Sequence, residues 1–118
     1  MVVVEVLETV QPTNKIIMSC RKLKELGYRI ALDDFEMKWD NENYLQLVQL
    51  ADIIKVDIQK TPRYKQIVML NSLKRYHVEF LAEKVENQEE YERCKKDGYS
   101  YFQGYFFSKP VILASNDV

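Results

Sequence analysis

A short apolar run that ends in two adjacent carboxylates is the feature that most constrains this sequence. The run is Arg29-Ile30-Ala31-Leu32, and Asp33, Asp34 and Phe35 follow it directly. Continuous apolar runs of this length are typical of buried parallel strands. In open α/β sheets and βα-barrels, the loops that leave the carboxyl ends of the strands converge on one crevice. The pattern therefore predicts a functional site at the carboxyl edge of a parallel sheet.

Three later apolar runs also lead into polar side chains. They begin near Ile53, Phe80 and Tyr101, and their polar residues are Lys55 and Asp57, then Glu83, then Gln103. Two adjacent carboxylates at a strand end repel each other unless a cation or a hydrogen-bond donor compensates them. Asp33 and Asp34 are therefore predicted to bind a ligand rather than only to cap a helix.

Helical patterns alternate with the strand-like runs. Strands are predicted over residues 2–7, 30–34, 53–58, 78–82 and 99–107, and helices over 16–26, 44–50, 62–76 and 87–96, with Gly27 and Gly98 ending the first and last helix. Strict alternation implies parallel strands with right-handed crossovers. A closed βα-barrel needs eight strands. About five strands and four helices therefore predict an α/β fold that is either an open sheet or a partial barrel.

Length and charge limit the alternatives. A chain of 118 residues with 47% hydrophobic content is predicted to form one domain, with residues 110–118 as a tail or linker. A net charge of -1 predicts neither a nucleic acid nor a membrane surface as partner, and no run reaches the roughly 18 apolar residues of a membrane span. Cys20 and Cys94 lack metal-site spacing, which predicts two packed thiols in a reducing, cytoplasmic compartment.

Five segments, in order and spacing, resemble the successive motifs of the EAL domain, a family that hydrolyses cyclic di-GMP. The segments are Val4-Glu5-Val6-Leu7-Glu8, Ala31-Leu32-Asp33-Asp34-Phe35, Ala51-Asp52-Ile53-Ile54-Lys55-Val56-Asp57, Leu81-Ala82-Glu83-Lys84-Val85-Glu86 and Phe102-Gln103-Gly104-Tyr105-Phe106-Phe107-Ser108-Lys109-Pro110. The sequences of these segments are most similar to those of EAL domains that precede an HDOD domain in bacterial signalling proteins. The resemblance implies the C-terminal portion of a TIM-like EAL barrel.

The resemblance also implies roles for individual residues. In the EAL family two magnesium or manganese ions activate a water that attacks one phosphodiester, and carboxylate oxygens suit such cations. The implied metal ligands are Glu5, Asp33 and Asp34. Lys55 corresponds to the lysine that orients the water, and Glu83 corresponds to the proposed base or support of the second metal. Gln103 corresponds to the amide near the nucleotide, and Glu8 corresponds to the acid that anchors the loop after the Asp-Asp strand.

Some of these residues have structural alternatives. Lys55 can instead be interpreted as a structural ion-pair partner of Glu83 or Asp57. The aromatic residues from Tyr99 onwards could stack on a guanine, but core packing of the last strand is the favoured interpretation. His77 is predicted to lie on the surface without a role in metal binding.

Departures from the family pattern bear on activity. The namesake Glu-Ala-Leu strand and the following asparagine-bearing strand, both sources of metal ligands, have no counterpart here. Residues 36–41 replace a glycine-rich loop, and Lys84 stands where the motif has glycine. We therefore expect weak or absent Mg²⁺ or Mn²⁺ binding and an inactive module that binds cyclic di-GMP or protein partners. The alternative is a fragment of an active cyclic di-GMP phosphodiesterase. Incomplete barrel edges further predict self-association, and the resemblance predicts a downstream HDOD domain.

Overall fold

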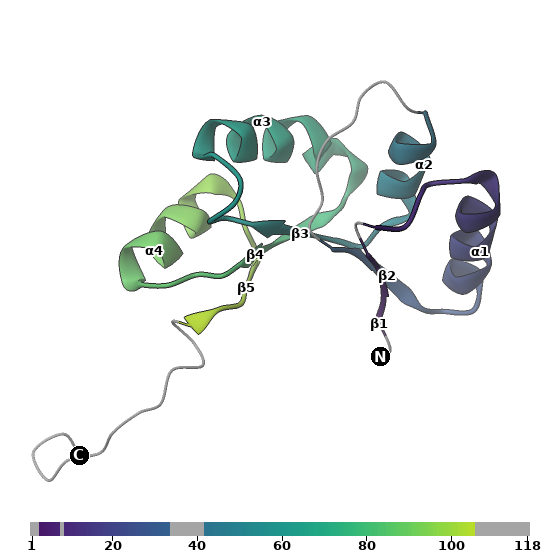
Figure 1. The fold of residues 1–118 in the computed structure, drawn as a ribbon, viewed down its shortest axis with the longest axis horizontal. Coiled ribbons are helices and arrows are strands. Elements are labelled where there is room, and N and C mark those ends of the chain that lie inside the picture. Colours follow the sequence, from purple (N-terminus) through teal and green to yellow (C-terminus); the bar gives the residue numbers. More distant parts are fainter. Residues whose placement is uncertain (1–2, 8, 34–41, 106–118) are drawn as a thin grey trace, which may run out of the picture.

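The computed structural model of the chain describes residues 3–7, 9–33 and 42–105, and strands and helices alternate through this part (Figure 1). The elements are β1 (Val3–Val6), α1 (Asn14–Glu25), β2 (Arg29–Leu32), α2 (Glu42–Leu50), β3 (Ile53–Asp57), α3 (Arg63–Leu73), the 3₁₀ turn η1 (Lys74–Tyr76), β4 (Glu79–Glu83), α4 (Gln88–Asp97) and β5 (Tyr101–Phe102). Asp34, Glu8, the 36–41 segment and the predicted 110–118 tail lie outside the described residues.

The five strands form one sheet in the order β1-β2-β3-β4-β5, and every neighbouring pair is parallel. Each helix connects one strand to its neighbour, so the carboxyl ends of all the strands lie at one edge. The predicted α/β fold of parallel βα units, a partial TIM-like barrel, is confirmed.

Local capping explains where the helices begin and end. The Thr13 hydroxyl accepts a hydrogen bond from the Ile16 amide at 3.3 Å, and the Asn87 side chain accepts one from the Glu90 amide at 2.9 Å. Gly98 follows α4 with φ 114°, a left-handed conformation that glycine adopts without steric cost. The prediction that Gly98 ends the last helix is confirmed, and α1 begins two residues earlier than predicted, directly after its Thr13 cap.

The helices lie on one side of the sheet (Figure 1). Alternate strand side chains point to that side and form the core with the helices, including Ile30, Ile54, Val56 and Ala82, all at most 1% exposed. The other side, which we call the open face, has no helix over it among the described residues. Its strand residues are Val3, Glu5, Arg29, Ala31, Ile53, Lys55, Asp57, Glu79, Leu81, Glu83 and Tyr101.

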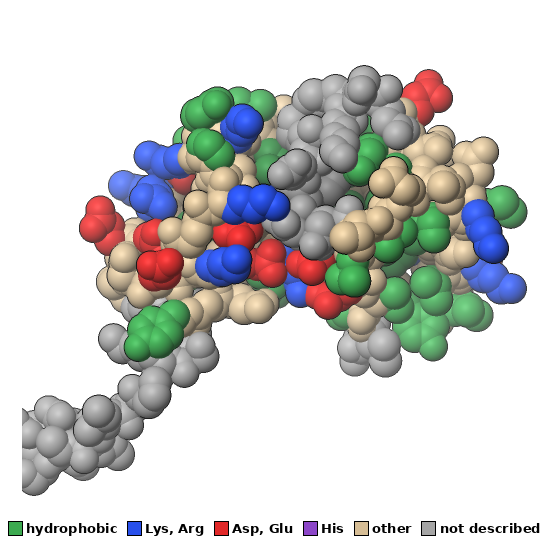
Figure 2. All heavy atoms as spheres, in the orientation of Figure 1, with side chains coloured by type: hydrophobic (Ala, Val, Ile, Leu, Met, Phe, Trp, Pro, Cys, Tyr) green, Lys and Arg blue, Asp and Glu red, His purple; other side chains and the backbone are tan. Residues whose placement is uncertain are grey.

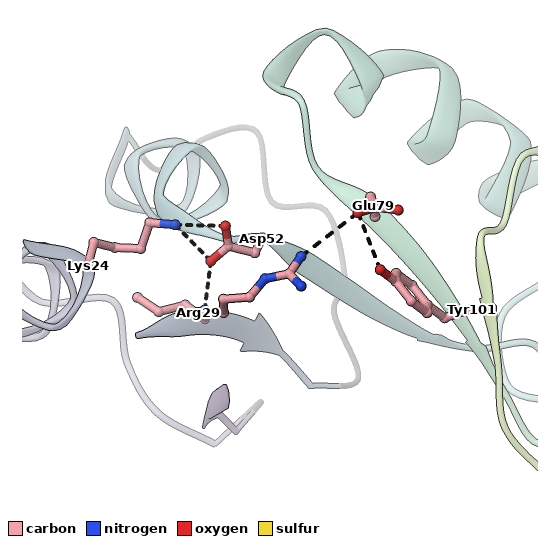
Figure 3. A network of polar contacts seen from close by, with 6 residues as sticks. Lys24, Arg29, Asp52, Glu79 and Tyr101 are labelled. Atoms are coloured by element: carbon pink, nitrogen blue, oxygen red, sulfur yellow. Dashed lines mark hydrogen bonds and ion pairs between the residues drawn. The ribbon is translucent and has the colours of Figure 1, made fainter. Parts of the chain in front are cut away.

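A polar network holds the amino edge of the sheet (Figure 3). Asp52, just before β3, accepts hydrogen bonds from the Lys24 ammonium at 2.7 Å and from the Ile30 amide at 2.8 Å. On the open face, Glu79 forms an ion pair with Arg29 at 3.8 Å and accepts a hydrogen bond from the Tyr101 hydroxyl at 3.4 Å. Because Arg29 lies on β2, Glu79 on β4 and Tyr101 on β5, this second group spans the four strands from β2 to β5.

Two strand predictions were wrong in detail. The first strand is not buried, because β1 is an edge strand and Val3 and Leu7 are 42% and 48% exposed. The last strand is only Tyr101–Phe102, since the chain bends at Gly104 with φ 150°. Residues 106–107, which were predicted to continue it, lie outside the described residues.

The aromatic residues near β5 are only partly in the core, which corrects the packing interpretation. Tyr99 is buried and its hydroxyl donates to the Gln66 side chain at 2.9 Å. Phe102 contacts Tyr91 edge to face, with 4.8 Å between ring centroids. Tyr101 and Tyr105 are 36% and 62% exposed.

The two cysteines are in the core and the single histidine is on the surface. Cys20 and Cys94 are buried free thiols, as predicted, and burial raises the pKa of both. His77 is exposed, as predicted, in a left-handed conformation with φ 60°. Within the described ranges, no helix has both the length and the apolar character needed to span a membrane.

Candidate functional site at the carboxyl edge

Among the described residues, Glu5, Asp33, Lys55, Glu83 and Gln103 lie within or directly after their strands, toward the carboxyl edge of the sheet. Parallel register aligns Glu5 with Ala31 and Asp57 with Glu83, while the Asp33 amide donates to the Val6 carbonyl at 2.9 Å. The Gln103 amide likewise donates to the Ala82 carbonyl at 2.9 Å, which continues the β4–β5 pairing. Acidic and basic side chains lie next to one another over the middle of the molecule (Figure 2).

Lys55 on β3 forms an ion pair with Glu5 on β1. The pair crosses β2 near Ala31, whose methyl group is too small to obstruct it. Burial alone would lower the pKa of Lys55, but the hydrogen bond and charge of Glu5, with the nearby charges of Asp33 and Glu83, raise it. Lys55 is therefore a firmly charged cation among carboxylates. Lys55 thus pairs directly with Glu5, a partner that the structural alternative did not name, and the charge of Glu83 acts on it as well.

Asp57 holds the loop after β3. Its Oδ1 accepts hydrogen bonds from the Gln59 and Lys60 amides at 3.0 and 3.1 Å, and its Oδ2 lies 2.8 Å from the Lys84 ammonium. Burial alone would raise the pKa of Asp57, but these interactions lower it. The carboxylate of Asp57 therefore orders the site's backbone.

Lys84 comes directly after β4 and has a left-handed backbone with φ 65°. Its carbonyl accepts a hydrogen bond from the Gln59 side chain at 3.0 Å, and its ammonium pairs with Asp57. Left-handed backbone is the conformation that glycine adopts most easily, so this position is one that suits glycine. In this chain the position contributes a positive charge to the site instead.

Gly104 brings the end of β5 against the segment after β4. A Cβ on Gly104 would lie 2.3 Å from the Val85 nitrogen and 2.6 Å from its oxygen. The Val85 amide also donates to the Gln103 carbonyl at 3.0 Å. Glycine at 104 therefore permits the close approach that places Gln103 beside the β4 end.

A surface depression of about 570 Å³ adjoins the ends of β4 and β5, and it is lined by Lys84, Glu86, Asn87, Gly104 and Tyr105. Sequence reasoning gave Glu86 and Asn87 no role, and the polar chemistry of the segment after Glu83 is the signal that could have identified them. Tyr105 belongs to the aromatic run for which ring stacking had been considered.

The chemistry of the donors suits a hard divalent cation, since carboxylates predominate. However, among the residues that the structure describes, which leave out Asp34 and Glu8, no group of three His, Cys, Asp or Glu side chains is placed to hold a metal ion. The cations nearest these acids are instead Lys55 and Lys84. The described residues therefore do not by themselves fit a paired-metal site.

The fold is a parallel βα sheet with helices on one face, and acids, a lysine and an amide lie at its carboxyl edge. This arrangement is that of part of a βα-barrel domain, in which the functional site lies at the carboxyl ends of the strands. The family model for the EAL domain matches residues 1–110. The chain belongs to the EAL domain family.

Individual relatives agree with this assignment. The chain is 41% identical over 118 residues to the YuxH protein of Bacillus subtilis, covering 98% of the chain and 29% of YuxH. It is 38% identical over 114 residues to the cyclic di-GMP phosphodiesterase CdgJ of Vibrio cholerae, covering 95% of the chain and 26% of CdgJ. The chain therefore spans less than a third of either relative.

A solved structure gives the corresponding spatial match. It is a standalone EAL protein from Vibrio cholerae O395 in its c-di-GMP-bound form, with a TM-score of 0.69 and 32% sequence identity. The match covers 93% of this chain and 50% of that one. The described fold is therefore about half of a standalone EAL structure.

Proposed function

We propose that this chain is the C-terminal portion of an EAL signalling domain, which binds cyclic di-GMP without hydrolysing it by itself. The observation that carries the proposal is that the site is one-sided. Its described side chains all come from a single five-stranded sheet, and within the described residues no second wall faces them. Small-molecule sites that enclose and orient a substrate are concave. A single wall can contact a nucleotide but lacks the groups that would align a water for attack.

Each site residue has a role in this proposal. Lys55 contacts a phosphate of the nucleotide, because it is the cation held at the centre of the edge, and Gln103 contacts the nucleotide through its amide. Glu83 remains the candidate base. Glu5 and Asp33, with Asp34, bind Mg²⁺ or Mn²⁺ weakly, because Lys55 competes for the same carboxylates. Glu8 anchors the loop that follows Asp34.

The second candidate is a fragment of an active phosphodiesterase that opens one phosphodiester bond of cyclic di-GMP to give linear pGpG. It is supported by the convergence of Glu5, Asp33, Lys55, Glu83 and Gln103 at one edge, and by the name of the relative CdgJ. An upstream Glu-Ala-Leu strand and an asparagine-bearing strand in the same protein would favour this candidate.

Binding and turnover can be measured separately. Calorimetric titration of the chain with cyclic di-GMP, with and without Mn²⁺, should detect binding, while chromatography of the same mixtures should detect no linear product. Lys55→Met should weaken binding at least tenfold. Lys65→Met, a change at an exposed lysine on α3, should leave it unchanged. Product that forms in proportion to the chain and disappears in Asp33→Asn would favour the phosphodiesterase instead.

The proposed context follows from the same assignment. We propose a cytoplasmic protein in which residues 1–118 form one EAL portion, residues 110–118 lead out of it, and an HDOD domain follows. We also propose that the isolated chain self-associates through the open edges of its sheet. No nucleic acid or membrane partner is proposed, because the net charge of the chain is only -1.

A further inference from the structure

Lys84 lies at the candidate site, but the proposed function gives it no role. It follows Glu83, the last residue of β4, and its side chain is 67% exposed. Among the described residues that line the depression beside β4 and β5, Lys84 carries the positive charge and Glu86 the negative charge. An anionic ligand in this depression would therefore be attracted by Lys84 and repelled by Glu86.

The backbone of Lys84 is strained and is held in place from two directions. Its φ of 65° is a left-handed conformation, which is unfavourable for a residue with a side chain. Its carbonyl accepts a hydrogen bond from the Gln59 side chain at 3.0 Å, and the same Gln59 amide donates to Glu90 at 3.0 Å. Glu90 also accepts a hydrogen bond from the Glu86 amide at 2.9 Å. Strain that neighbouring contacts maintain in this way is concentrated at functional sites, so a role for Lys84 in the site has to be considered.

The ion pair between Lys84 and Asp57 is compatible with a further contact. The ammonium of a lysine has three N–H donors, so it can hold Asp57 and a second acceptor at the same time. The Asp57 side chain is only 8% exposed, so a ligand that approaches from solvent reaches the ammonium before the carboxylate. Asp57 also accepts hydrogen bonds from the Gln59 and Lys60 amides, so its carboxylate stays satisfied if the ammonium turns toward a ligand.

Lys55 and Lys84 lie at two separate places along the carboxyl edge. Lys55, on β3, extends toward Glu5 on β1, whereas Lys84 extends from the end of β4 to Asp57 at the end of β3. A cyclic dinucleotide carries one negative charge on each of its two phosphodiesters, and lysine binds phosphate as a point charge. Two separate cations therefore match a ligand that carries two separate phosphates.

We propose that Lys84 is a phosphate-binding residue of this chain, whose ammonium contacts one phosphodiester of a bound cyclic dinucleotide while Lys55 contacts the other. The assignment rests on the proposed function, because it adds a contact to the same ligand. The competing explanation is that Lys84 only ties the end of β4 to β3 through Asp57. The two explanations differ in one respect: only the phosphate contact makes affinity depend on the positive charge of residue 84.

Calorimetric titration of the whole chain with cyclic di-GMP in EDTA tests this dependence. EDTA removes divalent ions, whose charge could replace that of a lysine. Lys84→Gly and Lys84→Gln should each weaken binding by about tenfold or more, although the glycine variant relieves the left-handed backbone. Lys84→Arg keeps the positive charge and should bind within about threefold of the unchanged chain. Lys65→Met removes a charge from an exposed lysine of α3 and should leave binding unchanged.

Salt dependence separates a charge contact from a loss of structure. Raising NaCl from about 50 mM to about 500 mM should weaken binding of the unchanged chain and of Lys84→Arg more than that of Lys84→Gly, because screening acts only on the charges that remain. Circular dichroism identifies folded variants, and Lys84→Gln is decisive if Lys84→Gly is unfolded.

The outcomes distinguish this assignment from the proposed function. Failure of the unchanged chain to bind cyclic di-GMP would overturn both. If the unchanged chain binds, the assignment alone is overturned by any of three results: undiminished binding in both neutral variants, an arginine variant as weak as the neutral ones, or the same salt dependence in all of them.

Discussion

Gly104 is the residue at which an added side chain should cost most. In Gly104→Ala the new Cβ would lie 2.3 Å from the Val85 nitrogen, so the backbone must move. In addition, φ at this position is 150°, a conformation that is strained for any residue with a side chain. Gly27 is the matched control, because its φ is 93° but no atom lies within 4 Å of its Cβ position. We expect Gly27→Ala to lower the free energy of unfolding by about 1 kcal/mol and Gly104→Ala by about 2–3 kcal/mol. Urea unfolding measures both, and equal losses would contradict the close approach.

Lys84 combines an unfavourable backbone conformation with a favourable ion pair. Lys84→Ala removes the contact with Asp57 but keeps a Cβ at φ 65°, whereas Lys84→Gly removes the contact and relieves the backbone. We expect the glycine variant to be more stable than the alanine variant by about 1 kcal/mol. Urea unfolding of the two variants tests this. An alanine variant as stable as the glycine variant would mean that the left-handed conformation is not retained.

Between elements, Asp52 ties α1 and β2 to the start of β3 (Figure 3). Burial alone would raise its pKa, but the hydrogen bonds from Lys24 and the Ile30 amide, with the charge of Arg29, lower it below the usual 3.8. The stabilisation is therefore complete above the unfolded pKa and is lost as the pH falls through the lower folded pKa. Asp52→Asn should reduce the free energy of unfolding by about 1 kcal/mol at pH 7, a value discounted for partial exposure.

The pH dependence separates this charge effect from simple loss of packing. Urea unfolding at pH 7 and at pH 3 should show a smaller stability loss on acidification for Asp52→Asn than for the unchanged chain. The matched control is Glu89→Gln, since Glu89 is an exposed acid on α4. A loss that is the same in the Asp52 variant and the unchanged chain would contradict the linkage.

The order of elements could be predicted because apolar runs and helix caps are local signals. The sequence predicts a buried strand at Ile30 to Leu32, and the structure confirms it. Gly98 ends its helix, as the sequence also predicts. The length of β5 could not be predicted, because the bend at Gly104 depends on a contact with Val85, which is distant in sequence.

The candidate site was predictable only in part, for the same reason. Convergence of Glu5, Asp33 and Lys55 follows from strand parallelism alone. The choice of Glu5 as the Lys55 partner depends on how the small Ala31 separates them, and the role of Lys84 depends on a backbone angle. Neither the Lys55–Glu5 pairing nor the backbone angle of Lys84 can be predicted from the local pattern of residues.

At the scale of the whole molecule, the sheet has two unpaired edges because its strand order runs from β1 to β5 without closing in the described part of the chain. Edge strands present free backbone donors and acceptors, and pairing with another copy would satisfy them while burying Val3 and Leu7. We expect the purified chain alone to form dimers or larger assemblies at micromolar concentration.

Light scattering across a dilution series measures this self-association. The apparent mass should fall toward that of a single chain on dilution, and Val3→Asp should shift this transition to higher protein concentration, because a charge at the β1 edge opposes strand pairing. Val68→Asp adds the same charge on α3 and should leave the transition where it is. A folded chain that stays monomeric at micromolar concentration would mean that the exposed edges are protected in another way.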